Sequence, residues 1–499
     1  AFASLSVVDL KVQDDLTVTD DASVGGTLTA TDLLIDTDVI VTDSTNDRVG
    51  INQTSPSTTL DVGGSIHFSS ILRATGDGSE SAPSIQPGND GDTGLFRPTA
   101  NTIGFSTAGT ERFRIASDGA ISTPTAGTSN TRIGVNAGNS IASGGNYNTV
   151  VGDEAGTAIT TGDYNTGIGY VSLDAITTGT LNSALGTYSL SADTLGSRSV
   201  AIGHGTLKVQ NFTTATDTYN TAVGYAAGEG ITTGINNTLI GGQAGDALTS
   251  GNNNTVLGYN ALSSDTLGDR SVAIGRHALT AQNLTTTTDV YNIAIGYNSG
   301  VAITTGIQNT IIGGNSGDAL TDADQNVVVG YRALTTDTLG SKTVAIGDQA
   351  LENQNFTTAT DTLNTAVGAS AGNQVTTGVQ NTFIGGGSGD AITTGASNVA
   401  VGANSLTSDT KGQNSVAVGR QALFTQNQTT ATDVYNTAVG ANAGLSITTG
   451  IQNVLIGGLA GDALTESSNN VAVGNTALGA DTLGGRSVAV GASALETQN

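Results

Sequence analysis

One short phrase returns at a fixed distance through three quarters of the chain. The phrase Tyr147–Gly152, Tyr-Asn-Thr-Val-Val-Gly, recurs with small changes at Tyr219, Tyr291, Leu363 and Tyr435, each 72 residues after the last. Each 72-residue block holds four shorter units, whose glycines are 17, 17, 17 and 21 residues apart, and with one unit in front there are 21 units. A repeat this regular predicts a stack of similar coils, because each unit buries its apolar side only against its neighbours.

Every position counted from the unit's glycine has its own chemical character. Val, Ile or Leu stands directly before the glycine, and Ala or Ser stands three residues after it in all units but one. Asn stands four residues before the glycine in the first three units of a block, and Ser or Thr in the fourth. In the second block the predicted structural positions are Asn220, Val223, Gly224, Ala227, Asn237, Ile240, Gly241, Ala244, Asn254, Leu257, Gly258, Ala261, Ile274, Gly275 and Ala278.

These columns predict strands that stack coil upon coil. Short runs such as Thr221–Val223 and Ser271–Ile274 have the β-branched composition of strands. A fixed glycine suits a bend with positive φ or a close backbone approach, and a column of Asn can stack its amides rung upon rung. We therefore predict an all-β fold, an elongated parallel β-solenoid or β-roll of 17-residue coils with a 72-residue super-repeat. We expect the residue before the glycine, for example Val223 or Ile240, to point inward.

Composition narrows the function. The chain has 499 residues, 70 of them glycine, no Cys, Met or Trp, only 12% charged residues and a net charge of −26. The acidity argues against nucleic acid and anionic membranes as partners, and no uninterrupted apolar run suits a membrane span. Coils this thin, with a column of small residues, favour packing against further copies of the chain, so we expect a parallel homo-oligomer.

Three regions are expected along the chain. Residues 1–61 form a β-rich segment, residues 62–125 a small β module, and residues 126–499 a shaft of about 21 coils. Four of the nine phenylalanines fall in the second region, and all five prolines precede the repeats. A ladder that needs every backbone N–H would exclude proline in this way.

Catalytic chemistry is not indicated. The three histidines, His67, His204 and His277, share no register, so we expect no metal site, no cofactor and no enzyme activity. Carboxylates recur ten residues before the glycine of each fourth unit, and most have Arg or Lys five residues later, as in Asp193 and Arg198. We interpret them as exposed ion pairs, since an active-site carboxylate would not return in every block.

Three other recurring motifs leave alternatives open. The four-residue extension of each fourth unit, first seen at Asn211–Asp217, predicts a lateral loop that is either a tolerated insertion or a binding ridge. The Gly241–Leu248 motif is similar to glycine-aspartate calcium repeats, but its copies are 72 residues apart, which leaves at most weak cation binding. The Ile-Thr-Thr-Gly motif skips rungs, which disfavours an ice-binding surface.

The repeat resembles the head repeats of trimeric autotransporter adhesins, through phrases such as Asn-Thr-Ala-Val-Gly and Ser-Val-Ala-Ile-Gly. That resemblance implies a trimeric parallel β-roll, although the repeat of that family is shorter. The N-terminal part resembles tail fibres of bacteriophages, particularly those of marine cyanobacteria. The matching phrases are Leu16–Val18, Ala22–Leu28, Arg48–Ile51, Thr54–Ser57, Leu60–Val62, Gly94–Pro98 and Gly109–Ile115.

These resemblances imply a structural fibre of a virus particle, a tail or side fibre with a stiff homotrimeric shaft for host-surface attachment. Its expected partners are further copies of the chain, other tail or capsid proteins, and a host-surface receptor, for which a glycan is one candidate. The alternative is a bacterial trimeric surface adhesin or extracellular filament at the cell surface.

Overall fold

The computed structural model describes residues 40–43, 48–51, 60–62, 76–87, 90–124 and 126–497. All regular structure in these residues is β-strand, and they contain no helix, so no helix among them could span a membrane. The chain divides into two compact units, Ala1–Asp77 and Gly78–Asn499. The boundaries predicted after residues 61 and 125 stay predictions.

Two small sheets precede the repeats. In the first unit, β1 (Ile40–Asp43) pairs antiparallel with β2 (Arg48–Ile51), which pairs parallel with β3 (Leu60–Val62). The second unit begins with an antiparallel four-stranded sheet, made of β4 (Gly94–Phe96), β5 (Ile103–Thr107), β6 (Thr110–Ile115) and β7 (Ile121–Ser122).

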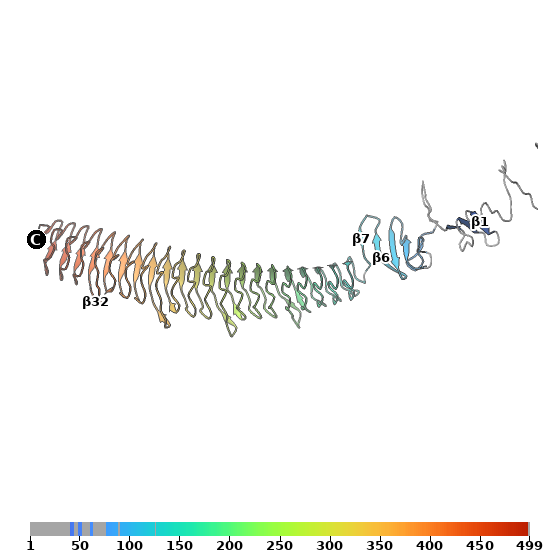
Figure 1. Ribbon diagram of the computed structural model, residues 1–499, viewed down its shortest axis with the longest axis horizontal. Helices are drawn as coiled ribbons and strands as arrows, with labels where there is room; N and C mark the ends of the chain where they lie inside the picture. The colour runs from blue at the N-terminus through green and yellow to red at the C-terminus, as the bar shows by residue number, and fades with distance from the viewer. Residues whose placement is uncertain are drawn as a thin grey trace, which may run out of the picture. The chain divides into compact units, whose positions relative to one another are not determined.

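The repeats form one continuous parallel ladder with one three-residue strand per coil (Figure 1). The 21 strands are β8 (Thr131–Ile133), β9 (Thr149–Val151), β10 (Thr166–Ile168), β11 (Ser183–Leu185), β13 (Val200–Ile202), β15 (Thr221–Val223), β16 (Thr238–Ile240), β17 (Thr255–Leu257), β19 (Val272–Ile274), β21 (Ile293–Ile295), β22 (Thr310–Ile312), β23 (Val327–Val329), β25 (Val344–Ile346), β27 (Thr365–Val367), β28 (Thr382–Ile384), β29 (Val399–Val401), β31 (Val416–Val418), β33 (Thr437–Val439), β34 (Val454–Ile456), β35 (Val471–Val473) and β36 (Val488–Val490).

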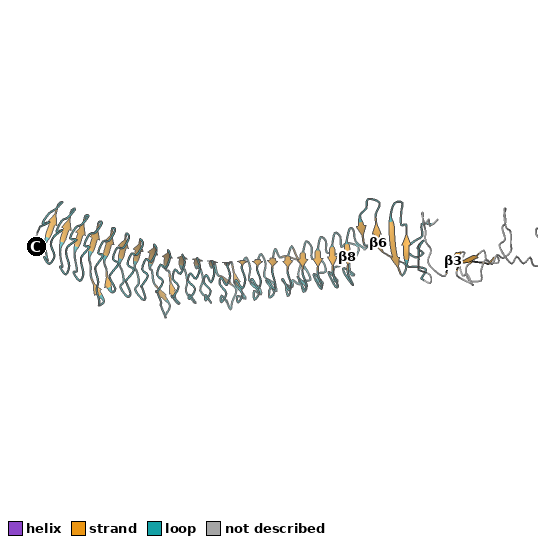
Figure 2. Cartoon of the chain, turned by 45° about the horizontal axis from the view of Figure 1, so that its top comes forward, coloured by secondary structure: helices purple, strands orange, loops and turns teal. Residues whose placement is uncertain are grey.

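Each strand pairs in register with the strand of the next coil. Ala222 of β15 lies opposite Leu239 of β16, which lies opposite Val256 of β17. Figure 2 shows these strands following one another along the stack, while most of the rest of each coil is loop and turn. The predicted all-β parallel β-solenoid of about 21 coils is confirmed.

The four-residue extensions form lateral loops at every fourth coil, and Figure 1 shows them projecting on the side away from the ladder. Each loop returns through a pair of two-residue parallel strands. The pairs are β12 (Gly196–Ser197) with β14 (Thr216–Asp217), β18 (Gly268–Asp269) with β20 (Thr288–Asp289), β24 (Gly340–Ser341) with β26 (Thr360–Asp361), and β30 (Gly412–Gln413) with β32 (Thr432–Asp433).

The position of the repeat glycine has both predicted features, a positive φ and a close approach of another backbone segment. Gly224 has a φ of 137°, and a Cβ atom built on it would lie 2.4 Å from the carbonyl oxygen of Gly241 in the next coil. Only glycine tolerates this φ and leaves room for that oxygen. Because every coil except the last repeats the contact, one glycine is required at each step of the stack.

The core is a narrow stack of side chains inside the coils, to which the strand and the turn after it both contribute. Its ladder residues are those two positions before the glycine, such as Ala222, Leu239 and Val256, which are fully buried. The Leu239 side chain occupies space next to Gly228 of the preceding coil. A Cβ atom on Gly228 would lie only 2.6 Å from Cδ1 of Leu239, so the turn needs glycine there. Most coils bury only two or three apolar side chains, several of them alanine, and this narrow core explains why the chain carries so few large residues.

The expected inward orientation of the residue directly before the glycine is wrong. Ile240 is 37% exposed and Leu257 is 45% exposed, and Val223 is half-buried. Successive side chains of a strand point to opposite faces, so burial of Leu239 places Ile240 outside. The sequence could not decide between the two directions, because both positions are apolar in almost every coil.

Candidate functional site

The outer face of the strand ladder, defined here as the residues one and three positions before each glycine, is the most unusual surface of the molecule. The position directly before the glycine forms a row of aliphatic side chains, Ile133, Val151, Ile168, Leu185, Ile202, Val223, Ile240, Leu257, Ile274, Ile295, Ile312, Val329, Ile346, Val367, Ile384, Val401, Val418, Val439, Ile456, Val473 and Val490. The position three before it holds only Thr, Ser, Val or Ile. The outer face therefore carries no charged side chain in any of its 21 strands.

This face is large enough to hold a partner. Strands about 4.8 Å apart and about 10 Å long, in a ladder of 21, give a face on the order of 1,000 Å². A stable interface buries about 800 Å² of each partner. An exposed row of aliphatic side chains that runs through all 21 strands, on a face of this size without charge, indicates an interaction site.

Aromatic and polar side chains border the outer face along the turn that follows the strands. The rings of Tyr170, Tyr188, His204 and Tyr225 form a continuous row, with successive ring centres 5.5, 6.2 and 5.5 Å apart. His277 lies 6.0 Å from Tyr259 further along the same border. Aromatic residues are enriched in protein interfaces, and His204 and His277 belong to this aromatic border.

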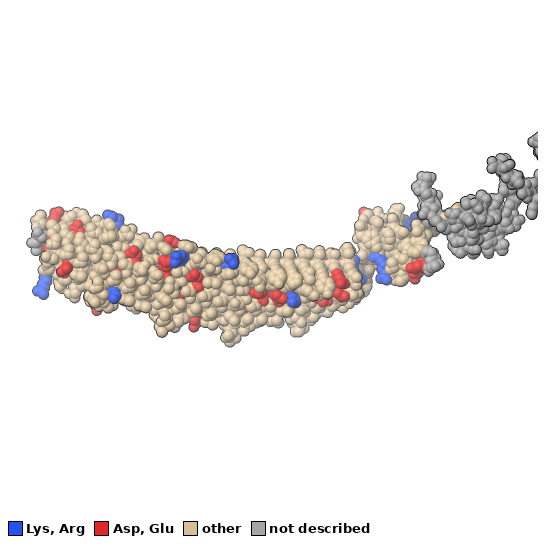
Figure 3. Space-filling view, in the orientation of Figure 1, with Lys and Arg blue, Asp and Glu red and all other residues tan. Residues whose placement is uncertain are grey.

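The corner before the strands has the same character. Tyr147 stacks on Tyr164 with ring centres 4.9 Å apart, and the guanidinium of Arg198 lies 5.6 Å from the ring centre of Tyr219. On the side of the solenoid that Figure 3 shows, the Lys, Arg, Asp and Glu side chains lie in small separate clusters.

The predicted Asn positions form a buried ladder parallel to the strands. Asn237 donates from Nδ2 to the carbonyl of Gly251 at 2.9 Å, and its Oδ1 accepts the backbone N–H of Asn254 at 3.0 Å. Asn237 itself donates its backbone N–H to Oδ1 of Asn220 at 3.0 Å. Each amide thus satisfies two backbone groups of the next coil that would otherwise be buried without partners.

In each fourth coil, where Ser or Thr replaces the ladder Asn, a buried carboxylate joins the hydrogen-bond network. The prediction that Asp193 forms an exposed ion pair with Arg198 is therefore wrong. Asp193 is fully buried and accepts hydrogen bonds from Gly196 N at 3.0 Å, Phe212 N at 3.2 Å and Gln210 Nε2 at 2.6 Å. Gln210 in turn accepts from Asn220 Nδ2 at 2.8 Å, which carries the amide ladder past the short Ser199. The network returns at Asp265, Asp337 and Asp409.

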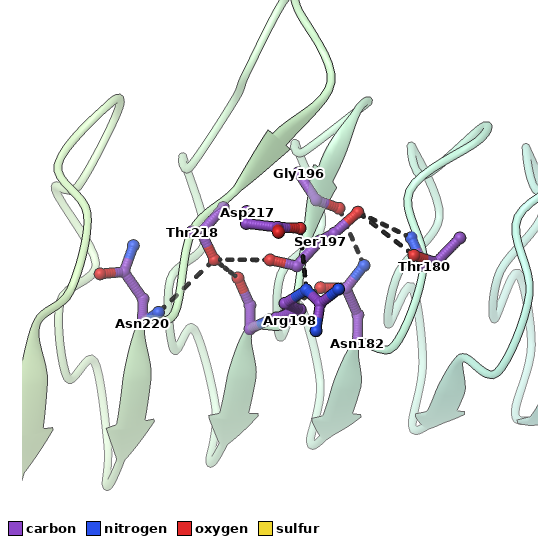
Figure 4. Close-up of polar contacts among 9 residues, drawn as sticks. Thr180, Asn182, Gly196, Ser197, Arg198, Asp217, Thr218 and Asn220 are labelled. Atoms are coloured by element: carbon purple, nitrogen blue, oxygen red, sulfur yellow. Dashed lines mark hydrogen bonds and ion pairs between the residues drawn. The ribbon is translucent and has the colours of Figure 1, made fainter.

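The basic residues pair with the lateral loops instead. Arg198 Nε lies 2.9 Å from Oδ1 of Asp217, as Figure 4 shows, and Arg270 and Lys342 make the corresponding ion pairs with Asp289 and Asp361. In the fourth block Asn414 replaces the cation and donates to Oδ1 of Asp433 at 2.9 Å. The sequence held a signal for these pairs, since both members recur at 72 residues with a constant separation of 19.

A second column of carboxylates, five residues after the glycine, has perturbed acidity. Burial raises the pKa of Asp174 to about 6, and the charge of Glu154 acts in the same direction. Burial likewise raises the pKa of Asp246, with a smaller contribution from Glu229. Within the described residues, Oδ1 of Asp174 and of Asp246 has no hydrogen-bond partner.

The remaining predicted positions fall in the coil interior or outside the described residues. Ala227, Ala244, Ala261 and Ala278 are fully buried, and they share the core with the ladder residues. His67 lies outside the described residues. The part of the chain that the structure describes holds no group of three His, Cys, Asp or Glu residues placed to bind a metal ion. No family model, no curated protein and no solved structure matches the chain.

Proposed function

We propose that the protein is the shaft of a homotrimeric fibre, in which three parallel copies bury the outer faces of their strand ladders against one another. The observation that carries this proposal is the outer face itself, because its aliphatic row runs without a charge from Ile133 to Val490. The number three rests on the resemblance of the repeat to trimeric adhesin heads.

The fibre belongs to a virus particle in this proposal, where it serves attachment to the host surface. Support comes from the tail-fibre phrases, two of which fall on β4 and β6, at Gly94–Pro98 and Gly109–Ile115. A ladder of 21 strands at about 4.8 Å per rung gives a shaft on the order of 100 Å long.

The test is to locate the chain with an antibody raised against residues 126–497. Tomograms are recorded of virus-infected host cells and of purified virus particles. Labelled fibres that project from the particle would support the proposal. Label confined to a cell envelope, with unlabelled particles, would overturn the virion assignment and leave the self-association to be tested separately.

A further inference from the structure

Sets of polar side chains repeat along the solenoid between the lateral loops and the strand ladder, and one of these sets lines a shallow recess. We call each set a bay, and define it by the residues five and six positions before the glycine in three consecutive coils, closed by the aspartate of the next loop. The first bay ends at Arg198 and Asp217, which Figure 4 shows with Thr180 and Ser197 between the ladder and the loop. The next three bays end at Asp289, Asp361 and Asp433.

The third bay is a cavity of about 220 Å³, lined by Ile307 and by the polar residues Gln308, Asp324, Gln325, Ser341, Lys342 and Asp361. Its carboxylates are each fixed by one contact, since Asp324 Oδ1 accepts the backbone N–H of Ile307 at 2.7 Å and Asp361 Oδ2 pairs with the ammonium of Lys342. Gln325 Nε2 donates to Gln308 Oε1 at 3.0 Å. The bay therefore combines oriented carboxylates, amides and an ammonium on one small surface.

Amide side chains return in the second and fourth bays. The second bay presents Asn236, Asn252, Asn253, Asp269 and Arg270 at the corresponding positions. Asn252 Oδ1 accepts the backbone N–H of Ile235 at 2.9 Å, as Asp324 does in the third bay. In the fourth bay Gln380, Ser397, Gln413 and Asn414 stand at these positions.

We propose that the bays bind an uncharged polysaccharide, with one sugar unit in each bay. A hydroxyl group both donates and accepts, so a ligand rich in hydroxyls needs the mixture of amides, carboxylates and cation that the bay provides. An anion is disfavoured because Lys342 is already paired and Asp324 adds a second negative charge. The cavity is smaller than the ~300–1,000 Å³ of sites for drug-sized ligands, which suits a single ring.

The spacing of the bays favours a polymer over a free sugar. Successive bays are four rungs apart, roughly 19 Å at 4.8 Å per rung. A chain of repeating sugars can occupy several bays at once, and the linked sites then bind far more tightly than one alone. This inference rests on the proposed fibre only for placing the bays on its outer surface, since the loops project away from the ladder.

The test begins with the wild-type protein on a printed array of neutral, acidic and amino-sugar oligosaccharides. The proposal expects binding to neutral glycans. The strongest neutral polymer is then titrated with a triple variant of the third bay, Gln308→Ala, Gln325→Ala and Lys342→Ala. Lys208→Ala, Thr233→Ala and Gln374→Ala is the control, because it removes three accessible polar side chains that lie outside both the bays and the border of the outer face.

We expect the bay variant to weaken polymer binding by roughly 10-fold through the loss of one linked site, and the control to leave binding unchanged. Protease resistance of both variants confirms their folding. Wild type that binds no glycan or only acidic glycans, or a control that weakens binding equally, overturns the proposal. The oligomeric mass is measured in the same samples, so failure of the bays with an intact trimer is distinguishable from failure of the fibre.

Discussion

Two adjacent glycines give the sharpest test of the coil geometry, because the same substitution should have opposite effects at them. Gly241 has a φ of 134°, and a Cβ on it would lie 2.5 Å from the carbonyl oxygen of Gly258. At Gly242 the nearest atom to a new Cβ is Cδ2 of Tyr259, at an ordinary contact distance of 3.4 Å.

Gly241→Ala combines a disfavoured backbone region with an overlap, so we expect it to destabilise its coil by about 3–5 kcal/mol. Gly242→Ala restricts the unfolded chain without strain, so we expect it to stabilise by about 0.4–1 kcal/mol. Both substitutions restrict the unfolded chain to a similar extent. The difference between their effects on stability therefore reports the folded coil alone.

Hydrogen exchange read by mass spectrometry measures both variants locally, which suits a stack whose coils open separately. We expect the first variant to lose more than ~100-fold in protection around residues 238–262, since each 1.4 kcal/mol is tenfold, and the second to lose none. Equal protection in the two variants would refute the close approach of successive coils.

Three further predictions concern the buried polar columns. Asn237→Ala removes the hydrogen-bond partners of Asn254 N and Gly251 O, so we expect the free energy of opening that coil to fall by about 3 kcal/mol, as measured by hydrogen exchange. The control Thr233→Ala changes an exposed side chain and should have little effect. Similar losses in the two variants would contradict the amide ladder. Burial raises the pKa of Asp174 to about 6 in the folded coil. The charged carboxylate therefore destabilises the coil fully above pH 6, and this destabilisation disappears below the unfolded pKa near 4. Asp174→Asn should therefore raise local protection, corrected for intrinsic exchange, at pH 7.5 but not at pH 4, and a gain equal at both would argue against this. Asp193→Asn turns an amide toward Gln210 Nε2 and should speed thermolysin cleavage of the first loop, while Asp217→Asn, which affects only an exposed pair, should not; cleavage at the same rate in both would count against the buried network.

The sequence was sufficient for the architecture because the repeat makes one coil's chemistry visible 21 times. The positions of the strands, the glycine bends and the Asn ladder all follow from columns whose residue type has a single structural use. Gly224 and Asn237 are examples, since no other residue provides the backbone conformation of the first or the paired hydrogen bonds of the second.

Orientation was harder to predict than position. Leu239 and Ile240 are both apolar, and only the structure shows which one faces the core. The prediction of an exposed pair for Asp193 is wrong for a related reason: its three donors come from residues 3 to 19 positions away, and pairing with the nearest cation is the simpler expectation. The recurrence of Gln210 and Asp217 at 72 residues was a usable signal for both networks.

The central claim, that the outer face of the ladder joins three copies, is tested most directly by sedimentation equilibrium of one variant pair. Ile240→Asp with Leu257→Asp places two charges on the outer face, and Thr232→Asp with Thr233→Asp places two on an exposed turn as the control. We expect wild type and control to sediment at three times the chain mass of 49.4 kDa, and the face variant at a single chain mass with its coils still protected. A monomeric wild type, or a face variant that remains trimeric, would contradict the account.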